Sequence, residues 1–273
     1  MIHPAALLLT PPGSLLNWNL AWLAIAGFLG GALNAVAGGG SFLLFPAMLG
    51  TGMPPVQANA TNTVALWPGQ LTSIAAYRQD VRKHLRLAIL MGFGGLVGGT
   101  IGAIVLLNTP QQTFLHLVPW LLLIAATIFA ASGPVTRLLD KRKGETHGAK
   151  ADPPRVLLFV LTAIVCFYIG YFGAGAGFLI ITLLSLFGME DMNEINALKV
   201  VSTTMANGVA FVIFVVGRQV EWRYCLLAMV AAAIGGYSSA SLARFVPPKV
   251  LRASVIVIGF GMAAWFFWKN SGK

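Results

Sequence analysis

The chain has 273 residues, of which 57% are hydrophobic and 10% are charged, and its formal net charge is +10. About 25% of the residues in an ordinary soluble domain are charged, whereas the first 77 residues of this chain contain no charged side chain. The basic residues lie in short polar breaks between apolar runs, as in the cytoplasmic loops of membrane proteins. Composition therefore predicts a polytopic membrane protein in a lipid bilayer. It argues against a nucleic-acid partner and, with two Cys, against a disulfide scaffold.

Ten apolar segments follow one another along the chain, and their residues suffice for roughly eight membrane spans of about 20 residues each. Two of them, Ser41–Leu49 and Ala176–Phe187, would reach only about 14 to 18 Å as helices, half of a hydrocarbon core of about 30 Å. Each directly follows a glycine cluster, so we expect half-helices that begin at a helix break. In chain order the segments are Trp18–Ala37, Ser41–Leu49, Ala60–Tyr77, Leu85–Leu107, Phe114–Ala131, Val156–Phe172, Ala176–Phe187, Ala197–Val216, Tyr224–Phe245 and Val250–Trp268.

The two halves of the chain repeat each other on either side of a long polar stretch. The sequence AGGGSFL at 37–43 aligns with GAGAGFL at 173–179, an offset of 136 positions. After one inserted residue the offset becomes 137, which aligns Asn59 with Asn196 and Gly98 with Gly235. We therefore expect an all-α fold of two homologous repeats, each with about four transmembrane helices plus a glycine-broken half-helix. The expected parts are a first repeat at 1–136, a cytoplasmic basic linker at 137–155 and a second repeat at 156–273.

Two membrane topologies fit this pattern. If the half-helices re-enter, each repeat has four spans, both termini are cytoplasmic, and Lys and Arg divide 14 inside to three outside. If the half-helices cross, each repeat has five segments, the repeats are inverted, and the division is 13 to four. The positive-inside rule barely separates these arrangements. We favour the four-plus-four arrangement because the half-helices are short.

The glycine clusters are the first candidate site. Each Gly costs a helix interior about 1 kcal/mol relative to Ala, so three in succession at 38–40 should end a helix. Freed backbone groups in lipid must be satisfied by protein, water or ligand. A break at the same point of both halves indicates a transporter's binding site, and a half-helix N-terminus there favours an anion. The alternative reading, close packing of helices, is the one we expect for Gly98 and Gly99.

Polar side chains form a second candidate feature. Asn59, Asn62 and Thr63 share one face of a predicted helix, and Asn196 and Lys199 hold equivalent positions in the second half. Such groups face a wet cavity or bond to a neighbouring helix. The substrate-binding candidates are Gly38, Gly39, Gly40, Ser41, Asn59, Asn62, Thr63, Gly173, Gly175, Gly177, Asn196, Lys199 and Thr203.

Lys199 is the sharpest single candidate, because an ammonium within a membrane span needs a partner. An anionic substrate would be one partner, and Glu194 is a local alternative. Snorkelling of the side chain to the interface is a third reading.

The chain contains no Walker A, HExxH or GxSxG pattern, which argues against ATP-driven pumping and against common intramembrane hydrolases. We expect no enzyme activity, no catalytic residues, no metal and no cofactor. The favoured interpretation is a secondary transporter of small anions. A channel or passive facilitator is the first rival and a membrane assembly factor the second.

The doubled motifs resemble those of the sulfite exporter TauE/SafE family. The residues that carry the resemblance are AGGGSFLLFPAML and GAGAGFLIITLLSLFGM, followed by ANATNTVALWPGQLTSIAAYR and INALKVVSTTMANGVAFVIF. The resemblance covers Trp18 to Trp268. It implies a multi-pass protein of the bacterial inner membrane that transports sulfite or organosulfonates together with protons. Glycine-rich faces leave a homodimer open.

Overall fold

The computed structural model describes residues 12–37, 39–142, 154–174, 177–189, 191–242 and 248–271, and these are helical with short connections and no strand. Ten of the described helices overlap the ten predicted apolar segments one for one, and α5 is an additional short helix. Several helices are longer than predicted, most of all α7, which extends past the predicted end at Ala131 to Arg142. The helices are α2 Pro12–Ala37, α3 Ser41–Gly50, α4 Pro55–Ala76, α5 Arg78–Lys83, α6 Leu85–Asn108, α7 Gln111–Arg142, α8 Arg155–Tyr171, α9 Gly177–Leu186, α10 Met192–Val216, α11 Trp222–Leu242 and α12 Pro248–Ser271.

Three stretches of the described chain are long and apolar enough to cross a membrane: Leu85–Asn108, Gln111–Ile128 and Met192–Val216. The number of spans expected from composition is larger. Helices such as α4 carry several amide side chains, which lower their hydropathy. An all-helical protein with apolar helices follows. The division into repeats at 1–136 and 156–273 stays a prediction, and residues 143–153 of the expected linker lie outside the described residues.

The halves of the chain exchange helices where they pack. α2 lies along α11, and α8 lies along α6, so each pair joins one helix from either half. Glycines make these contacts close. A Cβ on Gly98 would overlap the carbonyl oxygen of Ala163, and a Cβ on Gly99 would lie 2.6 Å from that of Ala206. The expectation that Gly98 and Gly99 serve close packing is therefore confirmed.

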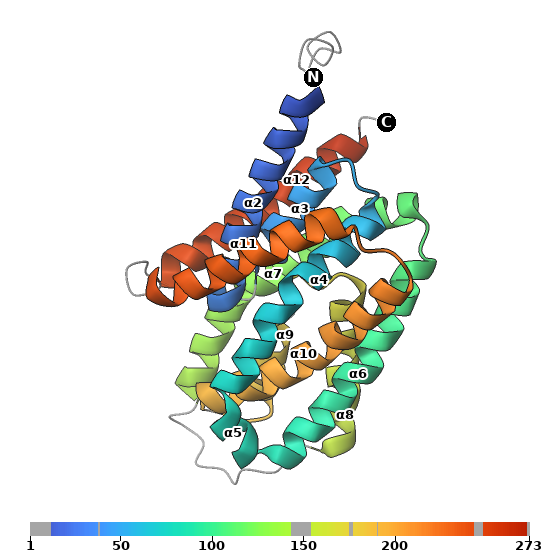
Figure 1. The fold of residues 1–273 in the computed structure, drawn as a ribbon. Coiled ribbons are helices and arrows are strands. Elements are labelled where there is room, and N and C mark those ends of the chain that lie inside the picture. The colour runs from blue at the N-terminus through green and yellow to red at the C-terminus, as the bar shows by residue number, and fades with distance from the viewer. Residues whose placement is uncertain are drawn as a thin grey trace.

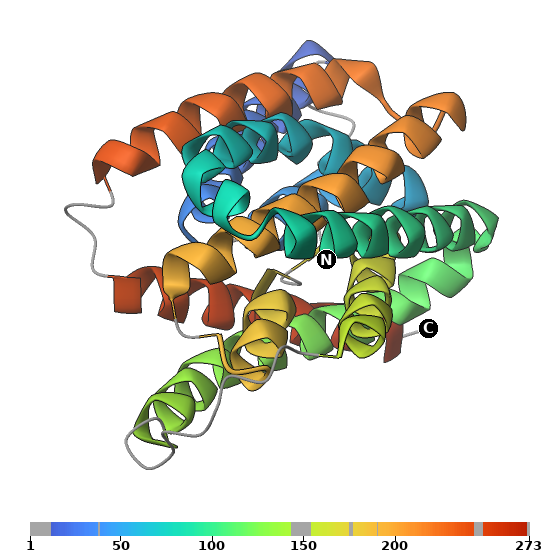
Figure 2. The ribbon, with the colours of Figure 1, turned by 90° about the horizontal axis from the view of Figure 1, so that it is seen from below.

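α4 and α10 cross at the centre of the molecule. Seen from below, α10 runs between α4 and α6 (Figure 2), and it packs against both. At the crossing, Trp67 Nε1 donates to the carbonyl oxygen of Thr204 over 3.2 Å. Asn207 Nδ2 donates to Gln70 Oε1 over 3.0 Å. The partners of both bonds are 137 positions apart, the same offset that aligns the two halves.

One end of the molecule, called here the upper end, is marked by contacts of helix starts. The N–H of Val56 donates to Gln111 Oε1 over 2.8 Å, and the N–H of Glu221 donates to Thr61 Oγ1 over 3.1 Å. The starts of α4, α7 and α11 are therefore close together. The first turn of α2 and the last turn of α12 lie at this same end (Figure 1).

The opposite, lower end contains α5 and the starts of α6, α8 and α10 (Figure 1). Here His84 Nε2 lies 2.9 Å from Glu194 Oε2. The four-plus-four topology is wrong on this point, because it places the loop containing His84 inside and the start of α10 outside. The five-segment alternative puts both on one side.

Candidate functional site

The first helix break lies between α2 and α3, where residues Gly39 and Gly40 turn the chain. The N–H groups of Phe42 and Leu44 donate to the carbonyl oxygens of Gly39 and Gly40, each over 3.1 Å. The N–H groups of Gly40 and Ser41 precede these bonds and have no intrahelical acceptor. Gly40 also packs against Gly30 of α2, with no room for a Cβ. Gly38 lies outside the described residues.

Asn62 of α4 reaches this break. Its Nδ2 lies 3.0 Å from Ser41 Oγ, its side chain is fully buried, and its Oδ1 has no partner in the described part of the chain. A serine hydroxyl can either accept or donate. With the amide in either orientation, one of its two polar groups is therefore left for another ligand.

The second break lies between α8 and α9. Gly173 has a φ of +79°, a left-handed conformation that favours glycine. Asn59 Nδ2 of α4 donates to the carbonyl oxygen of Tyr171 over 3.1 Å, and its buried Oδ1 has no partner among the described residues. Thr63 Oγ1 donates to the Asn59 carbonyl over 3.0 Å and lies beside Gly173. One face of α4 therefore contacts both breaks. Gly175 lies outside the described residues.

Lys199 of α10 reaches the second break from the other side. Its Nζ donates to Asn196 Oδ1 over 2.9 Å. Its Cδ lies 3.5 Å from the place a Cβ of Gly177 would take. Under the offsets that align the two halves, Lys199 and Gly177 correspond to Asn62 and Ser41. The two contacts are thus made at equivalent positions.

Glu194 does not pair with Lys199. Its carboxylate lies beside His84, and the described residues include no other carboxylate within ion-pair distance of Lys199. The local alternative considered from sequence is therefore wrong. Sequence reasoning missed the role of His84 because its partner lies 110 positions away on another helix.

The sequence model of one protein family, "Sulfite exporter TauE/SafE", matches residues 23–266 of the chain. The chain belongs to this family. Three relatives are similar to this family member over most of their length. They are a "Probable membrane transporter protein" of Haemophilus influenzae (24% identical, covering 90% of this chain and 93% of the relative), "Probable membrane transporter protein ORF9" of a Sinorhizobium species (25%, 89% and 90%) and "Probable membrane transporter protein YfcA" of Escherichia coli K12 (24%, 93% and 91%). No solved structure matches. Family and relatives together indicate a membrane transporter.

In this TauE/SafE family member, Thr203 forms no hydrogen bond to another candidate residue in the described part of the chain. Its hydroxyl donates to the carbonyl of Val200, 3.3 Å away in the same helix. The other described candidates form three contact groups. Two of them involve α4: Gly39, Gly40, Ser41 and Asn62 at the first break, and Asn59, Thr63 and Gly173 at the second. The third joins α9 and α10 and consists of Gly177, Asn196 and Lys199.

Proposed function

We propose that this protein is a secondary transporter of small sulfur-containing anions, sulfite or organosulfonates, across the bacterial inner membrane. The observation that carries the proposal is Lys199, whose ammonium bonds to the neutral Asn196 amide beside a helix break. Placing an ammonium within a membrane span costs about 2.5–3.5 kcal/mol on insertion scales. An amide oxygen supplies a hydrogen bond and no countercharge. A bound anion would supply both.

The first break complements this charge. The N–H groups of Gly40 and Ser41 at the start of α3, which have no acceptor among the described residues, offer donors and the positive end of a helix dipole. A helix end discriminates charge and size better than chemistry, so we assign selectivity to the side chains of α4 and α10.

Proton coupling fits the acceptor atoms of the site. Asn59 Oδ1 is held as an acceptor because its Nδ2 donates to the Tyr171 carbonyl. A buried acceptor favours a ligand that carries a hydrogen. The sulfite dianion takes up its first proton near neutral pH, so hydrogensulfite would present both a charge for Lys199 and an O–H for Asn59. The proton would then travel on the substrate.

Alternating access would follow from an inverted relation between the halves. The bonds between Trp67 and Thr204 and between Gln70 and Asn207 join positions 137 apart, as expected for a two-fold axis between α4 and α10. Among the described residues, the lower end carries eight basic residues, on α5 and at the start of α6, the end of α7 and the start of α8 (Figure 1), and the upper end carries three, so we assign the lower end to the cytoplasm. The lower group is Arg78, Arg82, Lys83, Arg86, Arg137, Lys141, Arg142 and Arg155, and the upper group is Arg218, Arg223 and Lys269.

The transport proposal is tested with Lys199→Ala in proteoliposomes under an imposed pH gradient. We expect uphill accumulation of labelled sulfite by the unmodified protein, and at least a tenfold loss of sulfite affinity in the variant. Lys83→Ala is the matched control, because Lys83 bonds to Asp80 on an exposed helix. Unchanged affinity in Lys199→Ala would remove this residue from the site, and flux that only runs downhill would favour the channel or facilitator.

The topology is tested by thiol labelling from either side of the membrane. Cys166 and Cys225 are fully buried, so introduced thiols should dominate the signal. We expect Arg82→Cys and Asn193→Cys to label from the cytoplasm and Arg223→Cys from outside. Labelling of positions 82 and 193 from opposite sides would contradict the proposed arrangement.

A further inference from the structure

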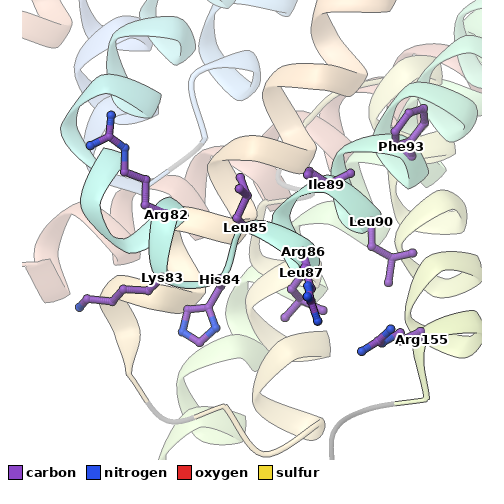
Figure 3. A pocket seen from close by; sticks show the side chains of 10 residues that line it. All are labelled: Arg82, Lys83, His84, Leu85, Arg86, Leu87, Ile89, Leu90, Phe93 and Arg155. Atoms are coloured by element: carbon purple, nitrogen blue, oxygen red, sulfur yellow. The ribbon is translucent and has the colours of Figure 1, made fainter.

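A cavity of about 900 Å³ lies at the lower end, where the starts of α6 and α8 meet, and it shares no lining residue with the candidate transport site. Arg86 and Arg155 line it from the two helices, and their side chains lie at the same level in the close view (Figure 3). Leu90 projects toward Arg155 from above. The cavity therefore has positively charged side chains, Arg86 and Arg155, next to the apolar face of α6.

The guanidinium charges of Arg86 and Arg155 are not neutralised within the described part of the chain, although another lining residue, His84, lies 2.9 Å from Glu194. No carboxylate there is within ion-pair distance of Arg86 or Arg155. Lys83 also lines the cavity, but it bonds to Asp80, and this bond raises the pKa of Lys83. The segment 143–153, which precedes α8, contains two Lys and two acidic residues and so has no net charge to offer.

Two helix N-termini add to this positive potential. α6 and α8 run in the same direction, because Gly94 packs on Thr162 and Gly98 on Ala163. Their first turns are thus neighbours at the cavity. Neither helix has a side-chain cap or an acidic residue in its first turn, so no cap or first-turn residue in the described part of the chain compensates the free N–H groups.

An exposed apolar wall rises from the cavity along α6. Leu85, Ile89 and Phe93 repeat every four residues on one face and are 53%, 51% and 59% exposed. A soluble anion would use the arginines and leave this wall in contact with lipid. A phospholipid would use both.

We infer that this cavity binds an anionic phospholipid, with the headgroup phosphate on Arg86 and Arg155 and an acyl chain along Ile89 and Phe93. Arginine suits phosphate because its planar guanidinium offers paired donors. Basic pockets between membrane helices on the cytoplasmic side are a recurring form of lipid recognition. The site joins α6 of one half to α8 of the other and does not depend on the transported substrate.

The test measures binding of phosphatidylglycerol and phosphatidylcholine to the full chain in detergent by native mass spectrometry. We expect phosphatidylglycerol to bind at least tenfold more tightly, and Arg86→Gln/Arg155→Gln to remove that preference. Arg86→Lys/Arg155→Lys should retain most of it, which separates loss of charge from loss of fold. Arg223→Gln, at the upper end, is the matched control and should stay within twofold of the unmodified protein.

Three results would overturn the inference. The first is equal binding of the two lipids, and the second is an unchanged preference in the double Gln variant. The third is displacement of the lipid by millimolar inorganic phosphate, which would assign the pocket to a free anion.

Discussion

The two helix breaks are contacted from equivalent positions by side chains of different charge. At the first break the Asn62 amide meets Ser41, and at the second the aliphatic stem of Lys199 lies against Gly177 while its ammonium bonds to Asn196. The half-helix residue that each of these side chains contacts also differs between the two breaks. A serine offers a hydroxyl to the short amide, and a glycine leaves space for the longer lysine.

The difference teaches that the two breaks would not contribute equally to the anion site proposed above. The first would supply neutral donors, and the second would supply a charge. Asn59 and Asn196 differ in the same sense, because Asn59 ties α4 to the Tyr171 carbonyl at the second break, whereas Asn196 accepts the hydrogen bond of Lys199. α4 therefore contacts both breaks, and α10 would supply the positive charge of the proposed site.

The largest expected difference concerns the glycines of the two breaks. In Gly40→Ala the new Cβ would overlap the Gly30 carbonyl and lie 2.9 Å from Cβ of Asn34. Overpacking of this kind costs about 1–3 kcal/mol, and backbone atoms cannot move aside easily. In Gly177→Ala the Cβ would meet Lys199 Cδ at 3.5 Å, an ordinary contact. We expect Gly40→Ala to lower the melting temperature in detergent by several degrees, and Gly177→Ala to leave it nearly unchanged. Equal losses would contradict the asymmetry.

A smaller difference is expected between Asn59→Ala and Asn196→Ala. The first leaves the Tyr171 carbonyl without its side-chain donor inside the protein, and an unsatisfied buried group costs about 1–3 kcal/mol. The second removes a hydrogen bond of the kind worth about 0.6 kcal/mol within membranes. Equilibrium unfolding should therefore rank Asn59→Ala as the less stable protein. The reverse order would show that α10, and not α4, holds the two breaks together.

Much of this arrangement could be predicted from the sequence, because it depends on local composition. Glycine clusters followed by short apolar runs predicted the starts of α3 and α9, and the packing role of Gly98 and Gly99 followed from glycines within a long apolar helix. The offset of 137 also aligned residues that turn out to touch, such as Gln70 and Asn207.

The direction of the helices could not be predicted in the same way. Moving a few basic residues from one side to the other changes the count from 14 and three to 13 and four, so the charge rule gave no decision. The contact between His84 and Glu194 shows that α6 and α10 begin at the same end of the molecule. This contact depends on how α10 packs against α6. No local pattern encodes a pairing between residues so far apart in the chain.

The smallest expected effect is that of Thr203→Val. Thr203 is among the polar residues that the sequence predicted to line the site, but its hydroxyl bonds within its own helix to the carbonyl of Val200. Such a local bond adds little to stability. We expect sulfite affinity to stay within twofold of the unmodified protein. Thr63→Val is the matched comparison, because its hydroxyl bonds to the Asn59 carbonyl beside Gly173. Losing this hydroxyl should weaken binding severalfold, because it lies at the second break beside Gly173, where we propose that the anion binds. An effect of Thr203→Val as large as that of Thr63→Val would extend the binding surface one turn along α10, toward its crossing with α4.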